Sequence, residues 1–208
     1  MDKGKNIFVY VVDDDKEVRD SLAWLLESIN LQTKPYESGD VFLEDFVAGQ
    51  QGCVVLDVRM PGMNGMDLHL FIKKIDPNIP VIIVTGHADV PMAIRAMKDG
   101  AFDFIEKPYN DQQMLERIQM AIHQQNDLQK DQQRKQAIQK MFDNLSKREN
   151  QVLSGILKSN PNKVIANDLC ISIKTVEAHR SSLMSKLDVK TVAELVRLAI
   201  EAEKDSHD

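Results

Sequence analysis

Carboxylate, hydroxyl and ammonium side chains follow the short apolar runs in the first half of the sequence. Asp13 and Asp14 follow the first run, Asp57 ends the third, Thr85 ends the fourth and Lys107 follows the fifth. Clustered carboxylates raise each other's pKa values unless a cation neutralises them, and a hard divalent ion suits such oxygen ligands. Mg²⁺ needs few protein oxygens, so Asp13 and Asp14 are predicted to hold it.

Lys107 and a metal ion opposite it would neutralise a phosphoryl group during its transfer to a carboxylate nucleophile. We predict Asp57 as this nucleophile because it stands alone at the end of the central run. The hydroxyl of Thr85 would donate to a phosphoryl oxygen, while Gly86 leaves room for a small phosphodonor. Each residue alone is weak evidence, since acidic residues after strands usually cap helices and Lys-Pro pairs usually mark turns.

These side chains can act together only if the apolar runs are neighbouring strands of one sheet. The runs at 7–12, 53–56 and 81–84 are almost continuously apolar, as expected for strands buried on both faces of a parallel sheet. With the stretches between them they make five β/α units, typical of a doubly wound, flavodoxin-like α/β domain, which binds ligands at the carboxyl ends of its strands. Weaker strands are predicted at 32–36 and 102–106, and helices at 18–29, 39–48, 64–75 and 90–98.

The second half of the sequence is helical. One long helix is predicted from 112 to 142, but its apolar stripe fades in the glutamine-rich stretch 124–139. A helix that is polar nearly all round is a spacer or disordered, and the absence of a single heptad register argues against a coiled coil. We assign residues 1–123 to a first domain, 124–144 to a helical linker and 145–208 to an all-α domain.

The all-α domain is predicted to contain four helices with an internal helix-turn-helix. Two stretches, 146–149 and 191–194, have the spacing of capping boxes. Between them lie a short helix at 163–169, a tight connection and a longer helix at 173–187. The longer helix has an outward polar face that suits a DNA major groove, made of Lys174, Thr175, Glu177, Ala178, Ser181 and Ser182.

Charge is unevenly distributed along the chain. The 208 residues carry 26 Lys and Arg against 32 Asp and Glu, and this net charge of −6 argues at first against a nucleic-acid partner. Residues 1–123, however, hold 12 basic and 20 acidic side chains, whereas 145–190 hold 8 basic and 4 acidic ones, a local excess of +4. Two distant cysteines exclude a disulfide framework, and no stretch is apolar enough to span a membrane, so a cytoplasmic location is expected.

Four motifs of the first half resemble the receiver domain of two-component response regulators. They are Val12-Asp13-Asp14-Asp15, Leu56-Asp57-Val58-Arg59-Met60-Pro61-Gly62, Thr85-Gly86-His87 and Ile105-Glu106-Lys107-Pro108, and the stretch from Thr85 to Ala93 is similar to the FixJ subgroup. The resemblance implies that Asp57 accepts phosphate from a sensor histidine kinase and that a cis bond joins Lys107 to its proline. It also implies that the backbone carbonyl of Arg59 joins Asp13, Asp14 and Asp57 around Mg²⁺.

The same resemblance implies a switch in the first domain. Phe104 occupies the position of an aromatic that in this family moves inward when Thr85 shifts toward the phosphoryl group, although it also reads as an ordinary core residue. The switch biases the fourth helix and fifth strand, 90–105, where family members commonly dimerise. Arg59 and His87 lie two residues beyond the predicted nucleophile and hydroxyl, so they either set the lifetime of the phosphoryl group or are solvated surface residues.

The all-α domain resembles the LuxR-type helix-turn-helix of the NarL/FixJ regulators. The motifs are Leu145-Ser146-Lys147-Arg148-Glu149, Asn162-Lys163-Val164-Ile165-Ala166, Thr175-Val176-Glu177-Ala178-His179-Arg180 and Lys186-Leu187. Ser159 departs from the family, which usually has glycine there, and is mildly strained if the position needs a positive φ. The resemblance implies a recognition helix at 173–187. Its implied base contacts are Glu177, Ala178 and Ser181, and its implied phosphate contacts are Lys163, Thr175, His179, Arg180 and Lys186, beside the outward Lys174.

The predicted function is a phosphorylation-activated transcription factor that binds promoter DNA as a homodimer and is not an enzyme. An enzyme using the same carboxylates would need a lid or substrate-binding insertion, for which the compact first domain has no room. A regulator whose receiver only docks proteins, without phosphorylation, is the alternative, which the intact aspartate, threonine and lysine set disfavours. By resemblance alone an activator is favoured over a repressor, with RNA polymerase as a further partner.

Overall fold

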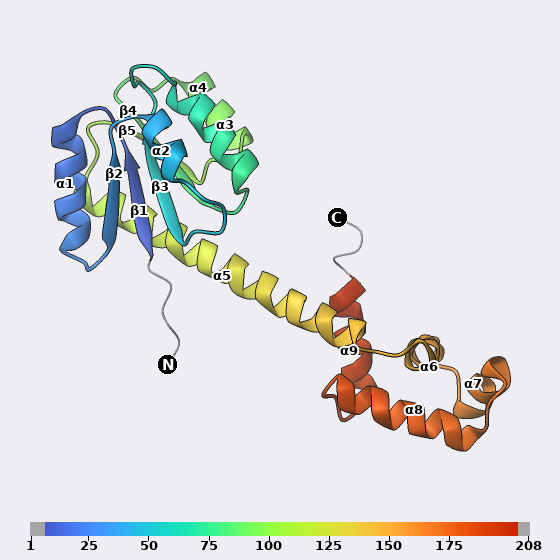
Figure 1. The fold of residues 1–208 in the computed structure, drawn as a ribbon. Helices are drawn as coiled ribbons and strands as arrows, with labels where there is room; N and C mark the ends of the chain where they lie inside the picture. The colour runs from blue at the N-terminus through green and yellow to red at the C-terminus, as the bar shows by residue number, and fades with distance from the viewer. Residues whose placement is uncertain (1–6, 204–208) are drawn as a thin grey trace. The chain divides into compact units, whose positions relative to one another are not determined.

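The computed structural model describes residues 7–203, which form two compact units divided after Gln129 (Figure 1). The first unit is an α/β domain and the second is helical throughout. The division falls within the stretch 124–144 that the sequence predicts as a linker. Among the described residues no helix is long and apolar enough to cross a membrane.

Five parallel strands form the sheet of the first unit, in the order β2-β1-β3-β4-β5. The register pairs Val12 with both Tyr36 and Leu56, and Asp57 with Val84, so the carboxyl ends of the strands meet at one edge. All the predicted strands are present, and the doubly wound α/β fold is confirmed. The strands are β1 (Phe8–Val12), β2 (Gln32–Tyr36), β3 (Gly52–Asp57), β4 (Val81–Thr85) and β5 (Asp103–Glu106).

Helices cover both faces of this sheet, as the continuous apolar runs require. On one face Leu26 and Ile118, from the first and fifth helices, pack with alternate residues of the strands. On the other face the second, third and fourth helices contribute Phe42, Ile72 and Ala96 to a separate cluster. The helices are α1 (Lys16–Glu27), α2 (Gly39–Asp45), α3 (Gly65–Ile75), α4 (Val90–Lys98) and α5 (Asp111–Asp143).

Aromatic rings fill the second of these clusters between β1, β2 and α2. The ring centroids of Phe42 and Phe46 are 4.8 Å apart, and Tyr10 and Tyr36 each meet Phe42 edge-on. Edge-to-face and offset pairs of this kind stabilise a core beyond the area that they bury. The tyrosines of the sheet are therefore part of its packed interior.

Helix α5 continues through the predicted linker. Its first turns are anchored under the sheet by Met114, Ile118 and Ala121, which are fully buried. Two positions of the stretch 124–143 are buried as well, Gln125 in the first unit and Ile138 in the second. The stretch from 124 to 143 is therefore helical and partly buried rather than a solvated spacer along its whole length.

Four helices follow α5 in the second unit, as predicted. Ser146 accepts a hydrogen bond from the Glu149 N–H while the Glu149 carboxylate accepts one from the Ser146 N–H, which confirms the capping box. Val152, Val176 and Leu183 lie at the centre of the core. The helices are α6 (Lys147–Leu157), α7 (Asn162–Leu169), α8 (Ile173–Lys186) and α9 (Val192–Glu203).

Four residues other than glycine adopt positive φ among the described residues, and each follows the end of a helix: Asn30, Ser159, Cys170 and Asp188. After α6, the Asn160 N–H donates to the Gly155 carbonyl and the Ser159 N–H donates to the Ile156 carbonyl. This is the Schellman pattern, which places a left-handed residue just past the helix. Ser159 has a φ of 59°, so it adopts the positive φ for which the family usually has glycine.

Candidate functional site

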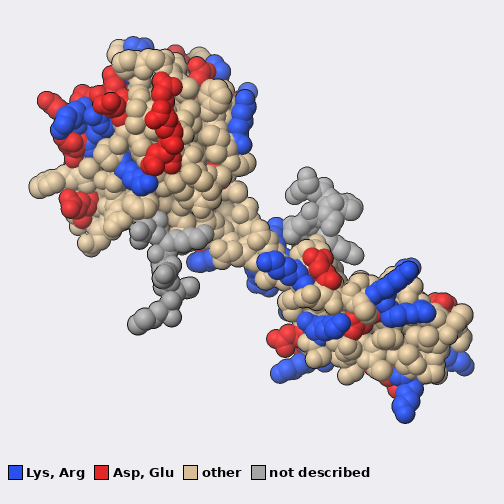
Figure 2. Space-filling model, in the orientation of Figure 1, with Lys and Arg blue, Asp and Glu red and all other residues tan. Residues whose placement is uncertain are grey.

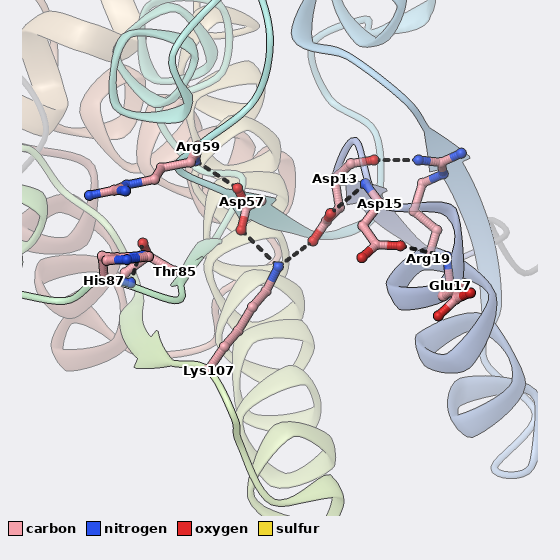
Figure 3. A network of polar contacts seen from close by, with 9 residues as sticks. All are labelled: Asp13, Asp15, Glu17, Arg19, Asp57, Arg59, Thr85, His87 and Lys107. Atoms are coloured by element: carbon pink, nitrogen blue, oxygen red, sulfur yellow. Dashed lines mark hydrogen bonds and ion pairs between the residues drawn. The ribbon is translucent and has the colours of Figure 1, made fainter.

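The carboxyl edge of the sheet holds two buried aspartates bridged by one lysine (Figure 3). Asp57 is the last residue of the central strand β3, and its Oδ1 accepts a hydrogen bond from Lys107 Nζ at 2.8 Å. Its Oδ2 accepts from the Arg59 backbone N–H at 2.6 Å. Asp13, one residue beyond β1, accepts from the same Lys107 Nζ at 2.6 Å through Oδ2. The structure therefore brings together three predicted residues separated by up to 94 positions.

The three consecutive aspartates after β1 have three different environments. Asp13 points inward, where its Oδ1 also accepts the Asp15 N–H and its backbone carbonyl accepts from the Arg19 guanidinium. Asp15 is the N-cap of α1, because its side chain accepts the Glu17 N–H at 2.8 Å. Asp14, predicted as a metal ligand, lies between them with an exposed side chain.

Burial and the shared lysine act in opposite directions on the charges of the site. Burial raises the pKa of Asp13, and the hydrogen bonds from Lys107 and Asp15 reduce this effect without reversing it. Burial alone would lower the pKa of Lys107, but its hydrogen bonds to Asp13 and Asp57 outweigh burial and raise it. Lys107 is therefore a firmly held cation between two carboxylates.

Two buried carboxylates with one ammonium group leave one negative charge without a counterion. Hard oxygen ligands of this kind are those that Mg²⁺ prefers, so Asp13 and Asp57 fit the predicted metal. No set of three His, Cys, Asp or Glu side chains within residues 7–203 is already gathered as a metal cage. The third oxygen would have to come from the exposed Asp14, from a backbone carbonyl such as that of Arg59, or from water.

The neighbouring strand ends supply the other predicted residues. Thr85, the last residue of β4, is fully buried, and its Oγ1 accepts the His87 N–H at 3.3 Å. Phe104 in β5 is partly buried and packs on the core beside α4. The Lys107-Pro108 bond is cis, as the family resemblance implies. Arg59 and His87 both lie at the rim with exposed side chains (Figure 3).

Helix α8 presents the candidate nucleic-acid interface of the second unit. Ser172 caps the helix by accepting the Thr175 N–H, and the hydroxyls of Ser172 and Thr175 are hydrogen bonded to each other. Lys163 of α7 is exposed. Arg180 is half-buried, and its Nη1 donates to Asn162 Oδ1 at 3.0 Å, which orients the guanidinium along α7. The predicted contacts with exposed side chains on α8 are Lys174, Glu177, Ala178 and Ser181, while His179 is half-buried.

Two residues at the C-terminal end of α8 are engaged inside the unit. Lys186 Nζ donates to Glu149 Oε2 at 2.8 Å and to the Asn144 carbonyl. The Ser182 hydroxyl donates to the other oxygen, Glu149 Oε1, at 2.7 Å. Ser182 is exposed, as predicted, and its hydroxyl is also held by a buried acceptor on α6. Lys186, which is predicted to contact a phosphate, thus also has a structural partner in Glu149.

Glu149 is a buried structural carboxylate that the sequence indicates only as a helix cap. It is buried and joins the start of α6 to α8. Hydrogen bonds from Lys186, then from Ser182 and from the Ser146 N–H, lower its pKa to about 2. A second signal is available in the sequence, because Glu149 precedes Val152, Leu153 and Ile156 on the inward face of α6.

The surfaces of the two units differ in charge (Figure 2). Acidic side chains gather over α2 on the first unit, while Lys and Arg side chains are spread over the face of the second. This follows the sequence, in which residues 1–123 hold an excess of acidic side chains and 145–190 an excess of basic ones. The helical unit is thus the one suited to a polyanion.

The chain joins a doubly wound domain, which has a lysine-bridged aspartate pair at its carboxyl edge, to a helix-turn-helix unit. This combination is typical of phosphorylation-dependent regulators of transcription. The family model for the response regulator receiver domain matches residues 9–119, and that for bacterial regulatory proteins of the luxR family matches residues 143–199. The chain therefore belongs to the response regulators that join a receiver to a LuxR-type DNA-binding domain. It is a two-component regulator of transcription, which implies a histidine kinase and DNA as partners.

Relatives of known name support this membership over nearly the whole chain. The transcriptional regulatory protein FixJ of Bradyrhizobium diazoefficiens is 41% identical over 93% of this chain and 95% of its own length. The response regulator protein TodT of Pseudomonas putida is 39% identical over 95% of this chain and 87% of its own length. Receiver domains of this family generally use Mg²⁺.

Solved structures agree with the sequence relatives. The response regulator StyR is 37% identical, with a TM-score of 0.88 covering 94% of this chain and 99% of that one. Full-length FixJ from B. japonicum is 39% identical, with a TM-score of 0.58 covering 96% of this chain and 98% of that one. The resemblance to the FixJ subgroup is therefore confirmed.

Proposed function

We propose that Asp57 accepts a phosphoryl group from a sensor histidine kinase and that this phosphorylation controls dimerisation and promoter binding. The observation that carries the proposal is the single ammonium of Lys107 shared by Asp57 and Asp13 at the carboxyl edge of the sheet. A carboxylate held in this way is buried, oriented and supplied with a cation. Phosphoryl transfer requires little else of a protein, because positioning and charge neutralisation supply most of the catalysis.

In the transfer, an Asp57 carboxylate oxygen attacks the phosphorus, the phosphorus–nitrogen bond of the phosphohistidine breaks, and the kinase imidazole leaves with its electron pair and takes up a proton. Lys107 stays near the phosphoryl oxygens as a counter-charge. The Arg59 N–H, which holds one Asp57 oxygen at rest, and the hydroxyl of Thr85 are the donors that we assign to the transferred group.

We assign the Mg²⁺ ligands to the carboxylates of Asp13, Asp14 and Asp57 and to the backbone carbonyl of Arg59. Asp13 and Asp57 support the assignment because both are buried and share one cation. When bound, the ion would supply positive charge to the transferring phosphoryl oxygens. Arg59 and His87 flank the site, and dephosphorylation rates of Arg59→Ala and His87→Ala proteins would measure their effect on phosphoryl lifetime.

We assign the output surface to α4 and β5, with Thr85 and Phe104 as the switch. Val90, Ile94 and Met97 are spaced by four and three residues on α4 and are 72%, 50% and 48% exposed, so they form one apolar stripe. A second copy of the chain would cover this stripe when phosphorylation shifts the switch. Moving such a surface from about 1% to 99% active requires phosphorylation to favour the active state by about 5.5 kcal/mol.

A receiver dimer brings two recognition helices to two DNA half-sites. One basic unit with a local excess of +4 binds phosphates weakly, and two units double the phosphate contacts. The base contacts assigned to α8 are Glu177, Ala178 and Ser181. The phosphate contacts are Lys163, Lys174, Thr175, His179, Arg180 and Lys186. Activation through RNA polymerase is the output that we expect from the family resemblance.

The decisive experiment is incubation with a small phosphodonor and Mg²⁺, followed by intact-mass and oligomer measurements. Wild-type chain is expected to gain one phosphoryl group and to dimerise. Asp57→Asn is expected to gain no phosphoryl group and to keep the oligomeric state of the untreated chain. A wild-type chain that binds DNA but forms no adduct would instead support the alternative, a regulator whose receiver is a docking module.

A further inference from the structure

We propose that Gln125 is a positioning residue that fastens helix α5 to the first residue of strand β3 and thereby couples Asp57 to the helix that leads into the DNA-binding unit. The fastening is argued from contacts inside the first unit. The coupling rests on the proposed function, because it requires that phosphorylation of Asp57 changes DNA binding.

The Gln125 side chain is 1% exposed and satisfies both ends of its amide. Its Oε1 accepts the Gly52 N–H at 2.6 Å, and its Nε2 donates to the Gln50 carbonyl at 2.9 Å. One turn further along α5, Gln129 Oε1 accepts from Gln51 Nε2 at 2.7 Å. Three consecutive residues before and at the start of β3 are therefore bonded to two amides of α5. The first compact unit ends directly after the second of these amides.

These amides continue the stripe by which α5 packs on the sheet. Met114, Ile118 and Ile122 are buried at spacings of four, and Gln125 and Gln129 follow at spacings of three and four. A buried amide is tolerated only when its donor and acceptor both have partners, since each unsatisfied group keeps the cost of its removal from water. The amide pair therefore acts as a specific attachment where the apolar contacts stop.

The strand side of the attachment is rigid. Gly52 has a φ of 134°, and a Cβ at this position would lie 1.7 Å from the Phe8 carbonyl oxygen. No residue other than glycine therefore fits here, and the backbone of Gly52 is packed directly against β1. Strand β3 runs from Gly52 to Asp57, every residue of it is buried, and it is paired on both sides with β1 and β4. At about 3.3 Å per residue the strand spans roughly 17 Å. Strand β3 is therefore a stiff, packed element that can transmit a displacement of Asp57 to the Gln125 amide.

The test compares full-length Gln125→Met with Gln124→Met. The first change keeps the side-chain length and removes both hydrogen bonds, while the second makes the same change at the exposed neighbouring position. Hydrogen exchange of the Gly52 amide reports the fastening directly, because that N–H donates to Gln125. The coupling is the ratio of DNA affinities with and without phosphorylation, measured on a duplex selected from a random pool by the phosphorylated wild-type chain.

Gln125→Met is expected to exchange the Gly52 amide about tenfold faster and to lose at least about fivefold of the phosphorylation-dependent affinity gain, with Asp57 still phosphorylated. Gln124→Met is expected to match wild type in both. Unchanged Gly52 exchange in Gln125→Met overturns the fastening, and an unchanged affinity ratio overturns the coupling. If Gln125→Met does not fold, Gln125→Leu replaces it, since its apolar side chain likewise forms neither the hydrogen bond from Gly52 nor the one to Gln50.

Failure of the proposed function gives a different result. In that case wild type itself shows no affinity gain on phosphorylation, and the coupling fails with it. Exchange of the Gly52 amide still decides the fastening, because that measurement needs no phosphorylation.

Discussion

Glu149 connects two helices of the DNA-binding unit through a single carboxylate. One oxygen accepts from Ser182, and the other accepts from Lys186 and from the Ser146 N–H. The position of α8 relative to α6 thus depends on the charge of one buried residue. Helix α8 is held by the same carboxylate that caps α6.

The stability of the helical unit is expected to fall in acid because of this residue. The folded pKa of about 2 lies below the ordinary 4.5, so the stabilisation is fully present above 4.5 and is lost as the pH falls toward 2. Glu149→Gln should lower the free energy of unfolding at neutral pH by about 2 kcal/mol and flatten this pH dependence. Denaturation followed by the methyl resonances of Val176 and Leu183, which lie in the core of the helical unit, measures this free energy of unfolding at each pH.

The control is Glu177→Gln, the same change on the exposed face of α8, which should retain the acid dependence of wild type. Coincident curves for wild type and Glu149→Gln between pH 4.5 and 2 would show that the carboxylate does not stabilise the unit in this way.

Among the elements, the ends of the helices carry strain that differs with residue type. Asn30 and Asp188 tolerate the left-handed conformation that follows α1 and α8, because Asn and Asp side chains are enriched there. Ser159 and Cys170 hold the same conformation after α6 and α7 without that advantage. The helix-turn-helix thus contains two connections that glycine would fit better.

Ser159→Gly is expected to stabilise the helical unit. Relief of the left-handed strain contributes about 1 kcal/mol, partly offset by the greater freedom of glycine in the unfolded chain, which leaves roughly 0.5 kcal/mol. Slower hydrogen exchange of the Asn160 amide, which donates to Gly155, measures it. Asp188→Gly is the matched control, because aspartate tolerates the left-handed conformation with little strain. An equal gain in stability in both variants would refute strain at Ser159.

The apolar stripe of α4 is the element on which we expect dimerisation to depend. Ile94→Asp should leave Asp57 phosphorylated and the chain monomeric. A symmetric dimer contains the change twice, so a loss of about 1.5 kcal/mol per subunit weakens association by more than about a hundredfold. Sedimentation of the phosphorylated chain measures the association, with Val47→Asp as the control at another exposed apolar position, outside the stripe. Full dimerisation of Ile94→Asp would place the interface elsewhere.

At the scale of the whole molecule, the acidic receiver and the basic helical unit oppose each other in DNA binding. Residues 1–123 carry 12 basic and 20 acidic side chains, and such a unit is repelled by DNA. Binding by the unphosphorylated chain should therefore be weak.

Lys163→Ala is expected to lower the salt dependence of DNA binding by about one phosphate contact per subunit. The residue is exposed on α7. The slope of log affinity against log salt concentration measures the effect. Lys158→Ala, at the end of α6, is the control, and identical slopes for Lys163→Ala and wild type would exclude Lys163 from the interface.

The sequence predicts most of the fold because strands buried on both faces leave unmistakable apolar runs, and parallel strands must bring their carboxyl ends together. Asp13, Asp57 and Lys107 follow from that rule alone. Gln125 could not be predicted, because a polar side chain is buried only where tertiary structure supplies its partners. For Gln125 these partners lie more than 70 positions away.

The two compact units also differ in their aromatic residues. Tyr10, Tyr36, Tyr109 and the single tryptophan, Trp24, all precede the division after Gln129, and no tyrosine or tryptophan follows it. The tyrosine and tryptophan bands of near-ultraviolet circular dichroism, and tyrosine and tryptophan fluorescence, therefore report on the first unit alone. Far-ultraviolet dichroism reports on both units, so comparing the two signals during one denaturation separates the unfolding of the switch from that of the DNA-binding unit.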